Sequence, residues 1–398
     1  MAKEKVLIIG GGFAGTKTAL ELADDERFDV TLLSNNDYFT YYPSLYHVAT
    51  GGSRANAAIP LGKLFENKNV KLVKAQAQTL ERKTKIVTCL DGGRHSYDTL
   101  ILALGQITNY FNIPGLRELS YGVKSISEVE RLKTHLHSQL VNDLKPDLNY
   151  VIIGAGATGT ELSGALQSYL MRVTYWHGLE KRPIHIDLIE AAPKILPKVP
   201  SDMSRAIARQ LKRQGIRIYL NRKVEGETAN ELYVNGKPIQ SHTVIWTAGT
   251  VINPFFSENN FALSANHKVA TDIYLEAEQD IFVLGDNANT PYSGMAQTAI
   301  YDAKFVANNL KRRASHKKLK SYRAKAPITV IPAREGWAAI AWGRLHLYGM
   351  IGWLLRQAAD ARAFHDFEPW DKALKQWFTY SESEAVDCPI CAKHQTKR

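Results

Sequence analysis

Two short glycine clusters with the same spacing carry the strongest chemical signal in this chain. They are Gly10-x-Gly12-x-x-Gly15 and, 144 residues later, Gly154-x-Gly156-x-x-Gly159. Each follows an apolar run and precedes a helical pattern, which predicts a strand, a tight turn and a helix start. Glycine permits positive φ in such a turn and lets a pyrophosphate approach the N–H groups of the helix N-terminus. Two such turns predict two bound dinucleotides in one chain, an arrangement suited to electron transfer.

The residue that closes the second strand of each unit should distinguish the two nucleotides. In the first unit the strand at residues 28–33 ends at Ser34 and Asn35, uncharged residues that can still hydrogen-bond a ribose. In the second unit the strand at residues 184–189 ends at Glu190. A carboxylate there accepts the ribose hydroxyls and repels a 2′-phosphate. The second turn therefore predicts NADH rather than NADPH, although a surface glutamate beyond a strand is the plainer alternative.

The first turn predicts FAD, because the chain returns late in the sequence to another buried strand ending in Gly285-Asp286. In such folds this aspartate contacts the ribityl or phosphate region of the flavin. The remaining predicted cofactor contacts are loop residues and glycines that close apolar strands: Pro43, Gly105 and Gly249.

Glu161 lies two residues beyond Gly159, in the first turn of the predicted helix. One interpretation is a favourable interaction with the helix dipole. The other places its carboxylate where nicotinamide meets flavin.

Length and composition fit a folded chain of several domains. The 398 residues carry a formal net charge of +11, and the three cysteines give no disulfide framework. Anionic cofactors and an anionic membrane surface account for the positive charge, and no nucleic-acid partner is expected. We predict an α/β fold with an FAD-binding domain at 1–112 and 248–326, an NADH-binding domain at 113–247, and a C-terminal membrane-associating region at 327–398.

The C-terminal region combines tryptophans with basic side chains. In residues 364–378 the apolar positions recur at helical spacing, which predicts a basic amphipathic helix lying on a membrane. The alternative is that this stripe packs on the core of the protein or forms a homodimer interface. No signal peptide and no spanning segment are expected. The pair Cys388 and Cys391 lies close to His394, but a zinc site would need two more ligands, so no metal is predicted.

Together these segments resemble the type II NADH:quinone oxidoreductases over roughly residues 4–310. The motifs that carry the resemblance are the glycine turns at 10–15 and 154–162 and the segments at 42–51, 192–197 and 296–299. The resemblance implies a glutathione-reductase-like pair of Rossmann domains, bound FAD, NADH as donor, a membrane quinone as acceptor and a C-terminal amphipathic helical anchor. It assigns Glu161 to the nicotinamide and flavin, and Gln297 to the quinone, with Tyr301 replacing a second glutamine of the family motif.

The expected reaction is a ping-pong transfer without proton pumping: hydride passes from NADH to flavin, and two electrons then pass to quinone. The expected location is a respiratory membrane, bound peripherally at its cytoplasmic face. Two alternatives stay open. One is a sulfide or other donor:quinone reductase, which would need redox cysteines near the flavin. The other is a non-catalytic NADH-sensing flavoprotein.

Overall fold

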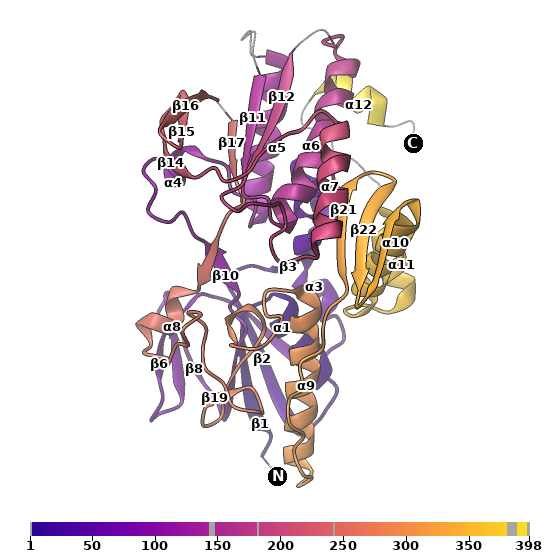
Figure 1. The fold of residues 1–398 in the computed structure, drawn as a ribbon. Helices are drawn as coiled ribbons and strands as arrows, with labels where there is room; N and C mark the ends of the chain where they lie inside the picture. Colours follow the sequence, from indigo (N-terminus) through magenta and orange to yellow (C-terminus); the bar gives the residue numbers. More distant parts are fainter. Residues whose placement is uncertain (1, 143–147, 181–182, 242, 380–387, 396–398) are drawn as a thin grey trace.

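The computed structural model describes residues 2–142, 148–180, 183–241, 243–379 and 388–395. Two α/β units, each built on its own sheet, are stacked end to end, and a smaller C-terminal part lies beside them (Figure 1). Among the described residues, no helix combines the length and apolar character needed to cross a bilayer.

The first unit is built on a six-stranded sheet with the order β19-β20-β9-β1-β2-β5. Its strands are β1 (Glu4–Ile9), β2 (Phe28–Ser34), β5 (Val70–Lys74), β9 (Thr99–Leu102), β19 (Glu276–Glu278) and β20 (Ile281–Val283). All neighbouring strands except β19 and β20 run parallel. Residues 6–9 of β1 and all four residues of β9 are buried, as expected where helices or loops cover both faces of the sheet. Helices α1 (Phe13–Leu22) and α9 (Ala296–Ala314) pack against each other on one side.

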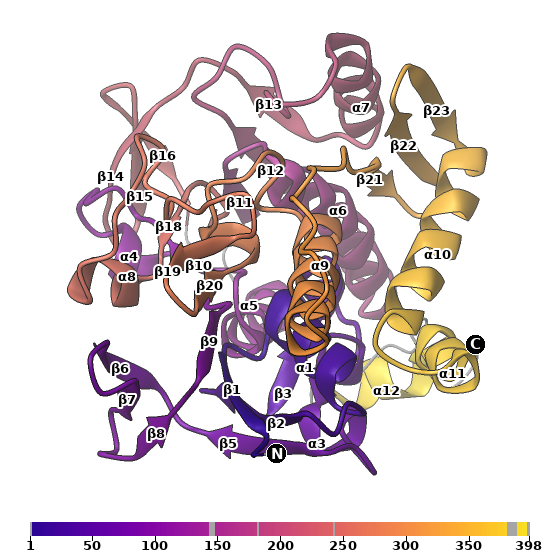
Figure 2. The same cartoon turned by 90° about the horizontal axis from the view of Figure 1, so that it is seen from below.

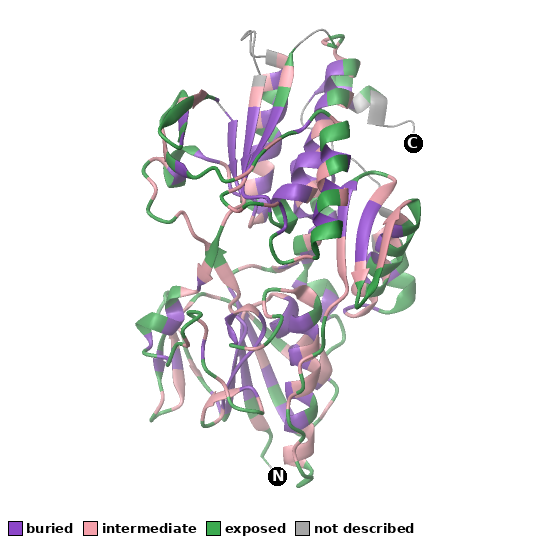
Figure 3. Ribbon diagram, in the orientation of Figure 1, coloured by how far each residue is buried: buried purple, intermediate pink, exposed green. Residues whose placement is uncertain are grey.

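The second unit repeats this design on a smaller scale. Its parallel sheet has the order β13-β12-β11-β17. The strands are β11 (Leu148–Ile153), β12 (Ile184–Ile189), β13 (Arg217–Tyr219) and β17 (Thr243–Trp246). The helices are α5 (Ile126–Asn142), α6 (Ala157–Trp176) and α7 (Ser201–Arg213). Figure 3 shows the buried positions concentrated in the strands of both sheets and on the helix faces that cover them.

Two short antiparallel strands join the units. The chain leaves the first unit through β10 (Gln106–Thr108) and returns through β18 (Thr250–Ile252), which pairs with it. In Figure 1 this ribbon lies between the two stacked units. Two three-stranded antiparallel sheets extend the units: β6 (Ala77–Glu81), β7 (Ile86–Cys89) and β8 (Arg94–Ser96) in the first, and β14 (Val224–Glu227), β15 (Glu231–Val234) and β16 (Lys237–Gln240) in the second.

The C-terminal part begins with a sheet that the sequence patterns did not indicate. Strands β21 (Thr329–Arg334), β22 (Trp337–Trp342) and β23 (Leu345–Gly349) form an antiparallel meander, and β21 packs on α6. Helices α10 (Met350–His365), α11 (Trp370–Thr379) and α12 (Pro389–Gln395) follow. Helix α10 packs against β22 and β23, and Figure 2 shows it running beside this sheet toward α11.

The prediction of one membrane-facing helix over residues 364–378 is wrong. The segment is divided between α10 and α11, and Phe364 and Phe367 are buried. The ring of Phe367 stacks on Phe39 at 4.6 Å, and the ring of Phe364 lies 4.5 Å from that of Tyr41. These two side chains therefore complete the core of the first unit. The alternative that the stripe packs on the protein itself is correct for them.

Candidate functional site

The first glycine turn connects β1 to α1. Gly10 has φ +113°, and its N–H donates to the carbonyl of Leu33 at 2.8 Å. A Cβ on Gly10 would collide with the carbonyl of Ala103, and a Cβ on Gly15 would collide with the carbonyl of Gly10. In contrast, a Cβ on Gly12 would meet no atom within 4 Å. The turn is closed beneath Gly10 and Gly15 and open in front of Gly12, at the N-terminus of α1, where a pyrophosphate fits.

The second glycine turn, between β11 and α6, repeats this construction. Gly154 has φ +96°, and its N–H donates to the carbonyl of Ile189 at 2.8 Å. A Cβ on Gly154 would press on Ala248, and one on Gly159 would collide with the carbonyl of Gly154. The space in front of Gly156 is open. Both turns therefore offer the same cradle for a dinucleotide.

The side chains predicted to contact the ribose of each nucleotide lie next to the glycine turn of their own unit. Ser34 is buried, with its hydroxyl facing Gly11, and Asn35 next to it is exposed. Glu190 accepts hydrogen bonds from the N–H of Ala155 at 2.7 Å and from the N–H of Ala192 at 2.9 Å. Each carboxylate oxygen of Glu190 keeps a lone pair for a further donor. The two units thus present a neutral and an anionic group in corresponding places.

The return of the chain brings Gly285 and Asp286 to the same end of the first sheet. Gly285 has φ +67°, and its N–H donates to Asp302 at 3.1 Å. Burial raises the pKa of Asp302 to about 6, although the hydroxyl of Tyr322 donates to it. The carbonyl of Asp286 accepts from the side chain of Gln106 at 3.4 Å.

The other predicted cofactor contacts lie on turns at this end of the sheets. Gly105 follows β9 with φ +65°, and Gly249 follows β17 with φ +77°. A Cβ on Gly105 would meet no neighbouring atom, whereas one on Gly249 would collide with the ring of Phe111. Pro43 lies in the short 3-10 helix η1 (Tyr42–Ser44) and is partly buried.

Glu161 belongs to a buried polar cluster that joins three parts of the chain. Its carboxylate on α6 lies 3.9 Å from the guanidinium of Arg356 on α10. Arg356 donates to Asp360 at 2.7 Å, and Asp360 accepts from the hydroxyl of Tyr41 at 2.9 Å. Burial raises the pKa of Glu161 to about 7, with Arg356 acting in the opposite direction and Asp360 in the same direction. A carboxyl with this pKa can hold or release a proton near neutral pH.

Sequence reasoning missed the partners of Glu161. The basic side chains of the C-terminal region are expected to face a membrane, but that of Arg356 is buried and ion-paired. A signal was present, because Arg356 and Asp360 stand four residues apart within the mostly apolar residues 350–361, a spacing at which opposite charges pair on a helix.

Gln297 and Tyr301 lie one turn apart on α9 and face the segment that leads into β21. The amide of Gln297 donates to the carbonyl of Ile328 at 3.0 Å and accepts from its N–H at 3.1 Å. The ring of Tyr301 lies 5.6 Å from that of Tyr322, and the ammonium of Lys325 lies 4.6 Å from its centre. Gln297 is exposed, and Tyr301 is half-buried.

None of the three cysteines lies at either glycine turn. Cys89 is buried in β7, and Cys388 and Cys391 lie at α12, beyond the far end of α6. A redox dithiol next to a flavin at the first turn is therefore not available from this chain.

Comparison with known proteins agrees with this geometry. The chain is 26% identical over 390 residues to a type II NADH:quinone oxidoreductase of Staphylococcus epidermidis, covering 91% of this chain and 96% of the relative. NDH2 from Plasmodium falciparum, solved in complex with NADH, superposes with a TM-score of 0.87 at 17% identity, covering 98% and 100% of the two chains. The sulfide:quinone oxidoreductase of Aquifex aeolicus has a TM-score of 0.78 at 16% identity, covering 97% and 100%. The model of the pyridine nucleotide-disulphide oxidoreductase family matches residues 4–303, and the chain belongs to that family.

Proposed function

We propose that this protein is an FAD-dependent, non-proton-pumping NADH:quinone oxidoreductase attached to the surface of a membrane. The observation that carries the proposal is the repetition of one open glycine turn in both units, with a carboxylate over the second turn only. The similarity to proteins named type II NADH:quinone oxidoreductase supports the same donor and acceptor.

The first turn would hold FAD. When bound, this cofactor can accept a hydride and pass on two electrons. The backbone at Gly12 would hold its pyrophosphate, Ser34 and Asn35 the adenosine ribose, and Asp286 the flavin half. The N–H groups near Gly156 would hold the pyrophosphate of NADH, and Glu190 its ribose.

Glu161 would lie beside the nicotinamide and flavin rings. Its neighbours fix it in place, because Arg356 approaches its carboxylate and is itself held by Asp360. The three charged side chains are themselves largely shielded from water, and the cluster can keep a proton on Glu161 for the quinone step.

Gln297 and Tyr301 would form one wall of the quinone site. The two-point contact of Gln297 with Ile328 holds the segment before β21 against α9. Tyr301 presents an aromatic face beside the cation of Lys325. Such a wall can stack on a flat head group and orient it.

The membrane contact would lie on the outer face of the C-terminal part. Large apolar side chains are exposed here: Trp342, Leu345, Met350, Ile351, Leu354, Leu355, Trp370 and Leu374. Exposed basic side chains lie among them: Arg344, Lys372 and Lys375. This composition suits an interfacial surface that approaches anionic lipid from the cytoplasmic face.

Steady-state turnover tests the proposed reaction. The purified protein, with its FAD, is given NADH, NADPH or sulfide in turn, with a soluble quinone as acceptor. We expect rapid quinone reduction with NADH and much less with the other two donors. Sulfide-dependent turnover with NADH inert would replace the proposal by sulfide:quinone reduction, and slow turnover with every donor would favour an NADH-sensing protein.

A double substitution tests the membrane contact. Ile351→Glu with Leu354→Glu should lower binding to anionic liposomes on the order of 100-fold, since each buried aliphatic side chain is worth about 1.5–3 kcal/mol. Leu90→Glu is the control, because Leu90 is as exposed as Leu354 but lies on the turn after β7. Equal loss of binding in the control, or none in the double variant, would move the contact elsewhere.

A further inference from the structure

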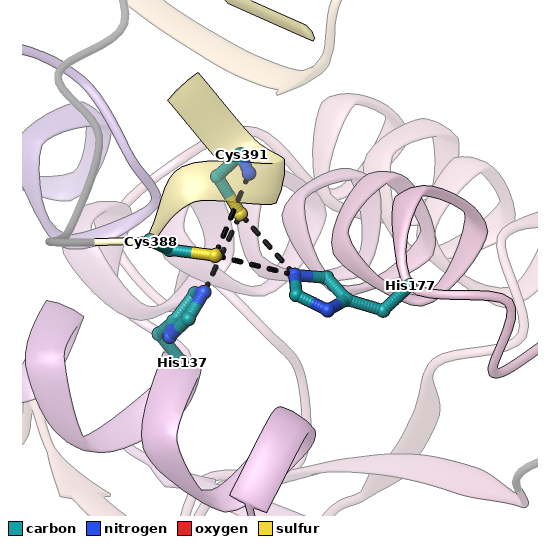
Figure 4. Close-up of side chains that lie close together, drawn as sticks. All are labelled: His137, His177, Cys388 and Cys391. Atoms are coloured by element: carbon teal, nitrogen blue, oxygen red, sulfur yellow. Dashed lines mark hydrogen bonds between the residues drawn. The ribbon is translucent and has the colours of Figure 1, made fainter. Parts of the chain in front are cut away.

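Four metal-ligating side chains converge at the far end of the second unit, away from both glycine turns. His137 lies on α5, His177 directly follows α6, and Cys388 and Cys391 lie at the start of α12. Figure 4 shows all four side chains pointing toward one another from these three elements. The expectation that no further ligands lie near the two cysteines is wrong, because the fold brings both histidines to them.

The spacing of the four ligand atoms matches one tetrahedral ion. The Nε2 atoms of His137 and His177 each lie 3.4 Å from the Sγ of Cys391, and the Nε2 of His177 lies 3.6 Å from the Sγ of Cys388. All four ligand atoms lie within 4.8 Å of one another. With Zn–S bonds of about 2.3 Å and Zn–N bonds of about 2.05 Å, a tetrahedral zinc separates its nitrogen and sulfur ligands by about 3.6 Å.

The surroundings of the cluster also suit a metal. Cys391 is 3% exposed, His137 is 7% exposed and Cys388 is 9% exposed, so water reaches these groups poorly. The N–H of Cys391 donates to the Sγ of Cys388 at 3.5 Å, a contact that stabilises negative charge on the sulfur. The hydrogen bonds that join Cys391 to the two imidazoles are of the weak thiol type, whereas thiolates and imidazoles are strong metal ligands.

We propose that His137, His177, Cys388 and Cys391 bind one Zn²⁺ as a closed structural site. Two thiols release their protons to solvent on binding, and the two thiolates then balance the charge of the ion, which allows a buried site. Two imidazoles and two thiolates favour zinc over harder cations. Four protein ligands leave no open position for substrate or water, which is typical of structural zinc.

The proposed role is to fasten α12 to the second unit. A helix of seven residues is too short to be stable alone in water. The ligands tie it to α5 and to the end of α6, the helix that carries Glu161 at its other end. This proposal concerns the chain's own ligands and does not depend on which electron donor the enzyme uses.

Metal analysis of the FAD-containing enzyme, purified without an affinity tag, provides the test. We expect about one zinc per chain in the native protein and a loss of most of it in Cys388→Ser with Cys391→Ser and in His137→Gln. Cys89→Ser and His185→Gln are matched controls, since they change a buried thiol and an exposed imidazole elsewhere, and should keep the metal. Equal zinc content in the cysteine variant and its control would overturn the proposal.

Two measurements on the native chain keep the test valid if the variants fold poorly. Replacement of zinc by Co²⁺ should give a thiolate-to-cobalt charge-transfer band and the intense visible bands of tetrahedral cobalt. A chelator should release the metal, expose both thiols to a thiol reagent and speed trypsin cleavage after Lys393 on α12. Metal-free native protein with both thiols already reactive, or with a Cys388–Cys391 disulfide, would overturn the proposal.

Discussion

The two glycine turns have the same backbone but differ in the side chains around them. Gly10 corresponds to Gly154, Gly11 to Ala155, and both turns are open at the middle glycine of the motif. The residue over the turn is Ser34 in the first and Glu190 in the second. In the proposed assignment the shared backbone would bind the diphosphate, and the differing side chain would select the nucleotide.

A second difference lies two residues beyond the last glycine of each motif. The first turn has Lys17 there, whose ammonium donates to the carbonyl of Asp366 at 2.6 Å and pairs with Glu21 at 2.9 Å. The second turn has Glu161, which faces Arg356. Both side chains reach the C-terminal part at α10 or just after it, so this part contacts both turns at corresponding positions.

The largest effect should come from a side chain that fills the open space of one glycine turn. Each such substitution should abolish binding at one nucleotide site and leave the other intact. Gly12 and Gly156 have negative φ, so Gly12→Val and Gly156→Val should fold. A side chain in the pyrophosphate space removes at least two charge-assisted hydrogen bonds of about 1.5–3 kcal/mol each, which weakens binding about 100-fold or more. Gly12→Val should be purified without FAD, whereas Gly156→Val should keep FAD and lose reduction by NADH. The flavin absorbance of each variant before and after NADH decides this, and FAD loss from both variants alike would contradict the separate assignment.

Glu161 should make stability depend on pH. Because burial raises its pKa to about 7 from the ordinary value of 4.5, the folded chain holds a proton that the unfolded chain has released between these pH values. The free energy of unfolding should therefore fall as pH rises through this window, by up to roughly 3 kcal/mol. Urea titrations at several pH values should show a shallower slope in Glu161→Gln than in the native protein and in Lys17→Gln. A smaller slope should remain in all three, because burial also raises the pKa of Asp302 to about 6 and that of Glu227 to about 8. An unchanged slope in Glu161→Gln would show that Glu161 does not titrate in this window.

Charge removal at Glu190 should have a smaller effect, confined to the second turn. Glu190→Gln keeps the shape of the side chain but loses a charge-assisted bond to the ribose, worth about 1.5–3 kcal/mol. We expect kcat/KM for NADH to fall about tenfold, kcat/KM for NADPH to stay or rise, and FAD content to be unchanged. Equal use of NADH and NADPH by the native enzyme would show that Glu190 does not select the donor.

The smallest effect should come from the proposed quinone wall. Gln297→Ala removes two neutral hydrogen bonds to Ile328, worth about 1 kcal/mol each, and Tyr301→Ala removes one aromatic face. Turnover with quinone should fall a few-fold in each variant, while single-turnover reduction by NADH stays the same. If either substitution slows reduction by NADH as much as quinone turnover, the wall is wrongly assigned.

Local patterns predicted those parts of the fold that depend on neighbours in sequence. The glycine turns and the strands β1, β2, β11 and β12 are each contained in a short segment. The sheet β21–β23 gave no clear signal, because Pro332 stands inside β21 and β22 is an unbroken apolar run without the alternation on which strand prediction depends.

The burial of Phe364 and Phe367 could not be predicted for a different reason. An apolar stripe looks the same whether it faces lipid or another part of the protein, and only the fold brings Phe39 and Tyr41 against it. The ligands His137 and Cys391 are likewise 254 residues apart, so no sequence spacing relates them.

The two half-reactions, measured separately without oxygen, test the central claim most directly. NADH is mixed with the FAD-containing protein in a stopped-flow instrument, and the reduced protein is then mixed with a soluble quinone. The proposal predicts bleaching of the flavin absorbance in the first mixing and its full recovery in the second, both faster than steady-state turnover. Failure of NADH to bleach the flavin, or failure of quinone to restore its absorbance, would contradict the claim. The claim is that FAD held at the first turn receives electrons from NADH held at the second and passes them to quinone.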